Sequence, residues 1–192
     1  MKAKYVFIDR DGVINKDPGG WTKYGYVTEW KDFHFLPGAL KAFKLLSDNG
    51  YESVIISNQQ CVGKGCLSEE SLAELTMQMR ETIETAGGTI AGVYYCTHLK
   101  DEKCSCRKPE PGLFSSAQEE LNIDNLNESF FVGDNKTDII AGTRAGMKTI
   151  LVLSGKSSIE DTDAWENKPD YICEDLLDAA DLIVNRLAGY TG

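Results

Sequence analysis

Two aspartates that directly follow an apolar run are the residues with the clearest chemical potential in this sequence. Tyr5 to Ile8 is a short run of β-forming residues, and Asp9 and Asp11 come next, in Asp-Arg-Asp-Gly. Two residues apart in an extended backbone, both carboxylates point the same way. Their repulsion and lost solvation are costly unless a cation or a catalytic role accounts for them. The alternative is an ordinary strand exit with Asp-Gly as its turn.

Three more polar residues complete a set suited to phosphoryl transfer. Ser57 and Asp134 end later apolar runs, and Lys108 lies in a Cys- and Lys-rich stretch. Asp9 would attack phosphorus and become an aspartyl-phosphate, while Asp11 would protonate the leaving alcohol and then activate water. Asp134 would hold Mg²⁺ together with Asp9, and Ser57 and Lys108 would stabilise the phosphoryl oxygens. Taken singly, Ser57 is more typical of a helix or turn cap and Lys108 of a solvated surface lysine, and only their joint placement after the strands favours the functional roles.

A separate cluster of soft ligands indicates a zinc site. Three cysteines and one histidine fall within eleven residues, at Cys96, His98, Cys104 and Cys106. This set matches a closed, tetrahedral Zn²⁺ site. Because no coordination position stays open, the expected role is structural: zinc would fold the irregular loop at about 96–110. The alternative is free thiols beside a chance histidine.

Strands alternate with helices along the chain, which predicts an α/β, Rossmann-like three-layer sandwich with a mostly parallel sheet. Expected strands are 5–8, 51–57, 90–95, 129–132, 148–153 and 171–173, and expected helices are about 37–49, 68–87, 112–121, 137–145 and 174–187. The polar residues after the strands should gather at one edge of the sheet. The long aromatic segment 16–36 is expected to be either a flap over the first strand's end or a packed surface loop.

Length and composition fit one soluble domain over residues 1–192, large enough for its own core and expected to be a monomer. The formal net charge of −10 argues against nucleic-acid or anionic-membrane binding. An anionic substrate would therefore need local cations. No segment looks like a signal peptide or a membrane span, so we expect a cytoplasmic protein. In that reducing compartment the six cysteines are more typical of metal ligands or buried thiols than of disulfides.

Several motifs resemble those of the haloacid-dehalogenase-like phosphatases, over roughly residues 4–187. They are Asp9-Arg10-Asp11-Gly12-Val13-Ile14-Asn15, Ser57-Asn58-Gln59, Arg107-Lys108-Pro109 and Gly133-Asp134-x-x-x-Asp138. The Cys-x-His…Cys-x-Cys-Arg-Lys-Pro stretch is similar to that of the branch that holds heptose bisphosphate phosphatases and histidinol-phosphate phosphatases. The resemblance implies Mg²⁺ on Asp9, Asp134 and the backbone carbonyl of Asp11, and no large cap domain.

The resemblance also implies which residues contact the substrate, and Arg107 would recognise it. The expected substrate-binding residues are Asp9, Arg10, Asp11, Gly25, Tyr26, Ser57, Asn58, Gln59, Arg107 and Lys108, and the expected zinc ligands are Cys96, His98, Cys104 and Cys106. Two departures from the heptose enzymes stand out: Asn135 occupies the place of a usual lysine, and 18–24 looks like an insertion.

Two substrates are compatible with this branch. Gly-Tyr-Val at 25–27 and Asn-Gln at 58–59 favour a heptose 1,7-bisphosphate, on the route to nucleotide-activated heptose for surface polysaccharide. The five residues between His98 and Cys104 form a short zinc loop, which favours histidinol phosphate and histidine synthesis. A non-catalytic, zinc-stapled binding module is the alternative from another functional class.

Overall fold

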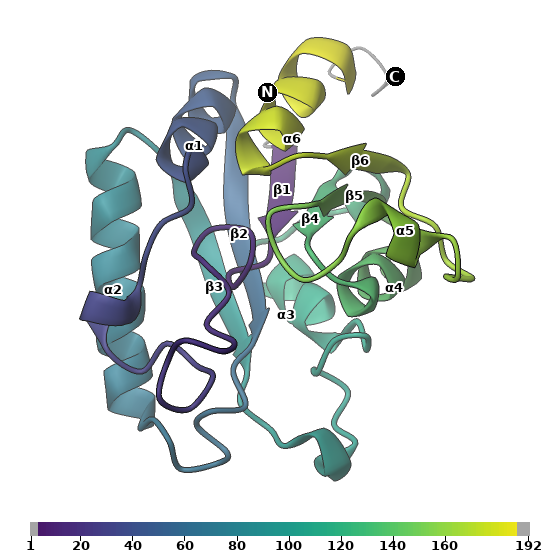
Figure 1. The fold of residues 1–192 in the computed structure, drawn as a ribbon. Helices are drawn as coiled ribbons and strands as arrows, with labels where there is room; N and C mark the ends of the chain where they lie inside the picture. The colour runs from purple at the N-terminus through teal and green to yellow at the C-terminus, as the bar shows by residue number, and fades with distance from the viewer. Residues whose placement is uncertain (1–3, 188–192) are drawn as a thin grey trace.

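The computed structural model describes residues 4–187, and in that range a six-stranded parallel sheet lies between two layers of helices (Figure 1). The predicted fold class is thus confirmed. The strands are β1 (Lys4–Ile8), β2 (Tyr51–Asn58), β3 (Ile90–Cys96), β4 (Phe130–Gly133), β5 (Lys148–Val152) and β6 (Tyr171–Cys173). The helices are α1 (Ala39–Asp48), α2 (Glu69–Thr85), α3 (Gly112–Glu120), α4 (Lys136–Arg144), α5 (Ile159–Thr162) and α6 (Leu176–Leu182).

The strand order changes direction at the middle of the sheet, between β1 and β4, although all strands run parallel. The order is β3-β2-β1-β4-β5-β6, so the chain builds outward on one side of β1 and then crosses to β4 on the other. At the end of β1, the amide of Asp9 donates to the Val132 carbonyl at 2.9 Å, which ties the two central strands together. Crevices at the carboxyl ends of strands beside such a switch are where open α/β sheets bind ligands.

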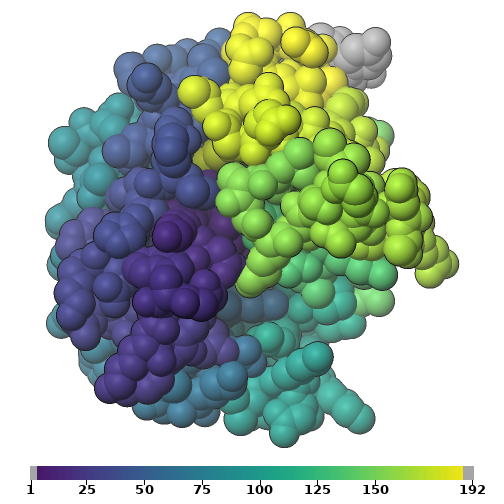
Figure 2. All heavy atoms as spheres, viewed as in Figure 1, coloured from purple at the N-terminus to yellow at the C-terminus, as the bar shows by residue number. Residues whose placement is uncertain are grey.

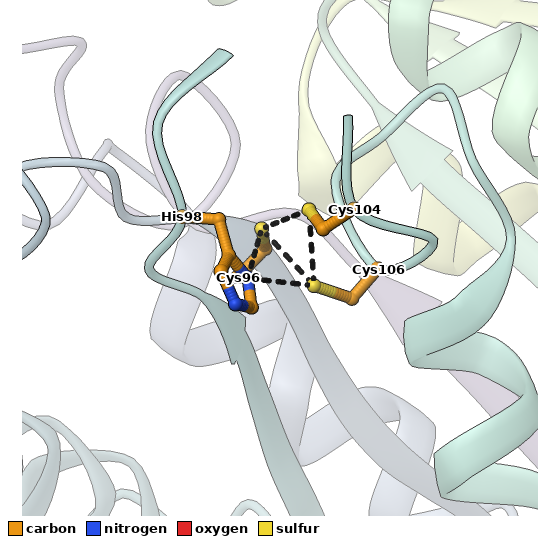
Figure 3. A group of neighbouring side chains, drawn as sticks. All are labelled: Cys96, His98, Cys104 and Cys106. Carbon is orange, nitrogen blue, oxygen red and sulfur yellow. Dashed lines mark hydrogen bonds between the residues drawn. The ribbon is translucent and has the colours of Figure 1, made fainter. Parts of the chain in front are cut away.

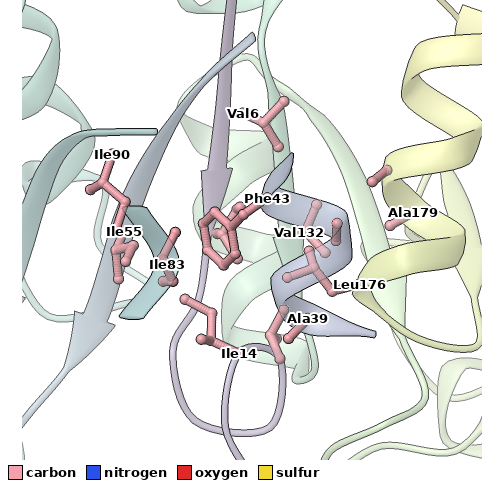
Figure 4. Close-up of a cluster of buried hydrophobic side chains, with 14 of the residues drawn as sticks. Val6, Ile14, Ala39, Phe43, Ile55, Ile83, Ile90, Val132, Leu176 and Ala179 are labelled. Atoms are coloured by element: carbon pink, nitrogen blue, oxygen red, sulfur yellow. The ribbon is translucent and has the colours of Figure 1, made fainter. Parts of the chain in front are cut away.

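Apolar side chains from both faces of the sheet bury the strands. Helices α1, α2 and α6 cover one face, where Phe43 of α1 and Ile83 of α2 pack against Ile55 of β2 (Figure 4). Helices α3 and α4 cover the other, where Phe114 meets Phe131 edge-on with ring centroids 4.9 Å apart. This two-sided burial explains why the strands read as nearly continuous apolar runs.

Most predicted elements lie within a residue or two of their observed bounds. The four-residue helix α5 was not predicted, because one helical turn shows no apolar periodicity; Ser158 caps it. The predicted closing helix changes character at its end, where α6 stops at Leu182 and a π-helical turn covers Ile183–Leu187. Between residues 4 and 187, no helix is long and apolar enough to cross a bilayer.

Segment 16–36 combines the two structures expected of it. Val27 and Phe33 are buried in the main core, and Trp30 stacks on Phe33 with ring centroids 5.0 Å apart. Asp17 and Tyr26, in contrast, line a cavity at the end of β1. In Figure 2 this purple segment lies on the left half of the visible face and borders the green residues that follow β5. The segment is therefore a packed loop whose first half also walls the cavity.

Candidate active site

A cavity of about 700 Å³ lies at the carboxyl edge of the sheet. It is lined by residues that follow β1, β2, β4 and β5, together with the first half of segment 16–36 and the 96–110 loop. The predicted residues that line it are Asp9, Asp11, Gly25, Tyr26, Ser57, Asn58, Cys104, Arg107, Lys108 and Asp134. Residues far apart in sequence thus meet where the strand order predicts. A second groove, along α2 and β3, is lined by none of them.

Lys108 is a buried cation at the floor of this cavity. Its Nζ lies 2.8 Å from Asp9 Oδ1 and 2.8 Å from Asp138 Oδ1, and donates to the Ile56 carbonyl at 3.1 Å. Asn58 holds its backbone twice, accepting from the Lys108 amide at 3.0 Å and donating to its carbonyl at 3.1 Å. Burial alone would lower the pKa of Lys108, but the two carboxylates outweigh it and raise the pKa. The lysine is therefore a fixed positive charge beside Asp9.

Three buried carboxylates face one another beside Lys108. Asp9, Asp134 and Asp138 each offer an oxygen, and these oxygens lie within 4.8 Å of one another. Burial, reinforced by Asp138, raises the pKa of Asp9 to about 6, although Lys108 opposes the shift. Burial, reinforced by the charges of Asp138 and Asp9, raises the pKa of Asp134 well above its ordinary value. An oxygen-only set that is costly to ionise fits a hard cation such as Mg²⁺.

The position of Asp138 adds to the predicted magnesium ligands. The sequence placed it in a motif but not among the ligands, and the structure puts it within reach of Asp9 and Asp134. Asp138 Oδ2 accepts from the Asn135 amide at 3.1 Å, and this hydrogen bond caps the start of α4. That the Asp11 backbone carbonyl also binds the metal stays a prediction.

Asp11 is held as a carboxylate by its neighbours. It accepts from Asn15 Nδ2 at 2.9 Å and from Gln59 Nε2 at 2.8 Å, and pairs with Arg10 at 3.0 Å. Burial alone would raise the pKa of Asp11, but the Arg10 charge and the two amides lower it below 3.8. The free site therefore presents Asp11 in the form that a general base needs.

Two predicted substrate contacts are placed differently by the structure. The side chains of Arg10 and Gln59 are 1% and 0% exposed, and neither lines the cavity. Arg10 turns away from it, between the rings of Phe33 and Tyr95 at 5.9 Å and 5.8 Å. Gln59 accepts from Arg10 at 2.9 Å and donates to Ser57 Oγ at 3.0 Å. In this structure both side chains support Asp11 or Ser57 from beneath the cavity, and their contact with a substrate stays a prediction.

The predicted zinc ligands form one cluster at the end of β3 (Figure 3). Cys96 Sγ lies 3.6 Å from Cys104 Sγ and 3.3 Å from Cys106 Sγ, and His98 Nδ1 lies 3.2 Å from Cys106 Sγ. A tetrahedron with Zn–S bonds of about 2.3 Å has S···S edges of about 3.8 Å. Burial raises the pKa of Cys96 to about 12, a cost that a bound cation removes by stabilising the thiolate. The donor set therefore fits a closed zinc site.

Comparison with known proteins assigns the family. The chain is 39% identical over 186 residues to the D-glycero-beta-D-manno-heptose-1,7-bisphosphate 7-phosphatase of Haemophilus ducreyi, covering 93% of this chain and 97% of that protein. The chain belongs to the haloacid-dehalogenase-like hydrolase family. The corresponding Vibrio cholerae phosphatase is 41% identical over 172 residues, which is 85% of this chain and 89% of that one. A family model described as HAD-hydrolase-like matches residues 105–179 of this hydrolase.

A solved structure extends the likeness to the whole fold of the hydrolase. The D,D-heptose 1,7-bisphosphate phosphatase from B. bronchiseptica, complexed with magnesium and phosphate, superposes with a TM-score of 0.83. It is 28% identical and covers 94% of this chain and 97% of its own. The family resemblance read from the motifs is thus confirmed.

One charged residue that lines the cavity of this haloacid-dehalogenase-like hydrolase, Lys156, was not predicted from the sequence. Lys156 lines the cavity, and its amide donates to Asp134 Oδ2 at 2.8 Å. Its Nζ pairs with Asp17 Oδ2 at 2.9 Å. Burial lowers the pKa of Lys156, but the hydrogen bond to Asp17 and the nearby carboxylates produce a net rise. The signal that could have found Lys156 is its place just after a predicted strand.

Asn135 stands where the heptose enzymes usually have a lysine, and here it caps the start of α4. Its side-chain oxygen accepts from the Thr137 amide at 3.4 Å, and Asp138 accepts from the Asn135 amide. The residue thus starts α4 and brings no charge to the cavity. The next residue, Lys136, is exposed and does not line the cavity.

Proposed function

We propose that this protein is a Mg²⁺-dependent phosphatase that releases the 7-phosphate of D-glycero-β-D-manno-heptose 1,7-bisphosphate. The observation that carries the proposal is the meeting of Asp9, Lys108 and Asp134 at the floor of one cavity. Relatives that are 33–41% identical over most of the chain are named for this reaction. The product would lead toward nucleotide-activated heptose and surface polysaccharide.

Asp9 is the proposed nucleophile. Its carboxylate attacks phosphorus, the bond to the sugar oxygen breaks, and an aspartyl-phosphate forms. Burial raises the pKa of Asp9 to about 6, and a bound cation would stabilise the ionised carboxylate that must attack. Lys108, 2.8 Å from Asp9 Oδ1, offsets the repulsion between this carboxylate and the incoming phosphate. Mg²⁺, held by Asp9, Asp134 and the neighbouring Asp138, would supply further positive charge at the phosphoryl oxygens.

Asp11 is the proposed acid and base. It must take up a proton before it can protonate the leaving sugar oxygen, and an anionic phosphate beside it raises its pKa in that direction. Once deprotonated, it removes a proton from the water that hydrolyses the aspartyl-phosphate. The amides of Asn15 and Gln59 keep its carboxylate aimed at the cavity through both steps. Ser57, with Oγ 3.0 Å from Gln59 Nε2, would contact a phosphoryl oxygen.

The competing readings have less support. Histidinol phosphate is favoured by the short zinc loop, whereas relatives that are 38–41% identical to this chain are named for the heptose substrate. A binding module without activity does not account for three buried carboxylates beside a buried lysine. Zinc on the cysteine cluster is proposed as a structural metal.

The proposed function is tested by phosphate release in the presence of Mg²⁺. The substrates are both anomers of the heptose 1,7-bisphosphate and histidinol phosphate, each with wild type and Asp9→Asn. We expect turnover of the β anomer by wild type, and a loss of about 10³-fold or more in the variant, because the amide is not a nucleophile. Faster turnover of histidinol phosphate would move the reaction to histidine synthesis. Equal activity of wild type and variant would refute the catalytic role of Asp9.

A further inference from the structure

The turn that follows β5 is fastened to the metal site at two points. Ser154 Oγ donates to the Gly12 carbonyl at 2.8 Å, and the Lys156 amide donates to Asp134 Oδ2 at 2.8 Å. Between them, a Cβ built on Gly155 would lie 2.0 Å from Asp134 Oδ2, so only glycine fits. This close approach fixes where the Lys156 side chain begins.

The Lys156 side chain leaves this turn along the wall of the cavity. Its Nζ lies 2.9 Å from Asp17 Oδ2, on segment 16–36. Asp17 is itself held, since its Oδ1 accepts from the Gly19 amide at 2.8 Å. An ammonium carries three N–H donors, and one pairing with Asp17 leaves two that can reach phosphate oxygens. Asp17 therefore orients Lys156 without exhausting its donors.

The charges around the cavity show why a second cationic wall is needed. Asp9, Asp11, Asp17, Asp134 and Asp138 all line it, in a chain with a formal net charge of −10. All three donors of Lys108 already contact Asp9, Asp138 and the Ile56 carbonyl. A second phosphate on the substrate must therefore find other cations, because carboxylates repel it.

Within the described chain, the remaining cations that line the cavity come from two sides. Lys100, Lys103 and Arg107 belong to the loop after β3, at one edge of the sheet. Lys156 follows β5, on the other side of the central strands β1 and β4. A substrate whose first phosphate is at Asp9 thus meets positive charge on both walls, and Lys156 alone supplies it on the β5 side.

We propose that Lys156 is a specificity-determining residue that binds the phosphate that is not cleaved. This inference rests on the proposed function only in assuming a substrate with two phosphates. The lysine distinguishes a sugar bisphosphate from the corresponding monophosphate, and Asp17 positions its ammonium. The reacting phosphate stays with Asp9, Ser57 and Lys108.

The test compares two substrates that differ only in the distal phosphate. KM and kcat are measured for heptose 1,7-bisphosphate and heptose 7-phosphate, with wild type, Lys156→Met and Lys156→Arg. In Lys156→Met we expect the KM of the bisphosphate to rise about tenfold or more, because a charge-assisted contact is lost. Its kcat, and the kcat/KM of the monophosphate, should change less than about threefold. Lys156→Arg should keep most of the selectivity, since it retains donors and charge.

Lys136→Met is the matched control, because this exposed lysine lies close in sequence to the metal site but outside the cavity. It should behave like wild type on both substrates. Equal losses of Lys156→Met on both substrates would show that the ion pair only holds segment 16–36, and would overturn the inference; unchanged selectivity would also overturn it. If wild type fails on the bisphosphate altogether, the proposed function fails and this inference fails with it.

Discussion

Buried polar side chains that never touch the cavity shape the reactive groups of this site. Gln59 is the clearest case: it is fully buried, and its Nε2 donates to both Asp11 and Ser57 while Oε1 accepts from Arg10. A buried amide whose donors and acceptor are all in use holds its partners in one orientation. The proposed general base, Asp11, and the hydroxyl proposed to bind phosphate, that of Ser57, therefore share one support.

Gln59→Met should lower kcat and leave KM nearly unchanged. The methionine keeps the volume but removes the hydrogen bonds that orient Asp11, and a misplaced base slows the chemical steps by about tenfold or more. Steady-state kinetics on the heptose bisphosphate measure this split. Arg107→Met is the contrasting variant, since Arg107 lines the cavity and its loss should raise KM. A raised KM with normal kcat in Gln59→Met would support Gln59 as a substrate contact.

At the scale of one element, the 96–110 loop places Lys108 beside Asp9 although it has little regular structure. Apart from a short 3₁₀ turn at Lys100–Glu102, it has no helix or strand between β3 and α3. Cys96 anchors it at the end of β3, and Lys108 lies two residues beyond Cys106. A metal on the cluster would therefore hold the backbone that aims Lys108 at Asp9. Asn58 completes the anchoring from β2.

Cys104→Ser should lower activity about tenfold or more and weaken the loop, although it leaves every proposed reacting group in place. Zinc content, phosphate release and protease sensitivity of the loop are measured together. Cys66→Ser is the control, because Cys66 is a half-exposed thiol outside the cluster. Full activity and full stability of a zinc-free preparation would refute the structural role of the metal.

At the scale of the whole molecule, the three buried carboxylates come from both halves of the sheet and meet between them. Asp9 follows β1, whereas Asp134 and Asp138 follow β4, on the other side of the switch in strand order. Their mutual repulsion and burial, only partly offset by Lys108, oppose folding in the absence of a metal ion. A cation that binds only the folded chain would reverse this cost and stabilise the protein by mass action.

Mg²⁺ should raise the free energy of unfolding of wild type, by about 2.7 kcal/mol at a free concentration of about 100 times Kd. Asp134→Asn should lose most of this increment. Without Mg²⁺ the variant should be at least as stable as wild type, because it removes a buried carboxylate that is costly to ionise. Urea unfolding with and without Mg²⁺ measures both the Mg²⁺ increment and the difference in stability between variant and wild type. Asp48→Asn, at the exposed last residue of α1, should keep the full increment. A full increment in Asp134→Asn would contradict the proposed ligand.

The negative net charge and the cations that line the cavity indicate what kind of ligand the protein binds. The net charge of −10 favours a small anionic ligand that local cations capture over nucleic acid. The monomeric state, the cytoplasmic location and the single-domain organisation stay predictions.

The sequence by itself determined the sheet, the family and most of the residues around the cavity. Apolar runs and turn residues are local signals, and parallel topology brings the ends of such runs to one edge whatever the details. Asp9, Asp134 and the cysteine cluster could therefore be found from their places after predicted strands. The proposed zinc ligands are close in sequence, so their spacing alone was enough to predict that their side chains cluster.

Only the tertiary structure decided which side chains face the cavity and which lie beneath it. Arg10 and Gln59 stand in the same motifs as Asp11 and Ser57, yet they turn into the core, because irregular turns after a strand do not keep its alternation. Asp138 and Lys156 joined the site through contacts with Lys108 and Asp134 across the sheet. Such contacts depend on packing between distant segments, which no local pattern encodes.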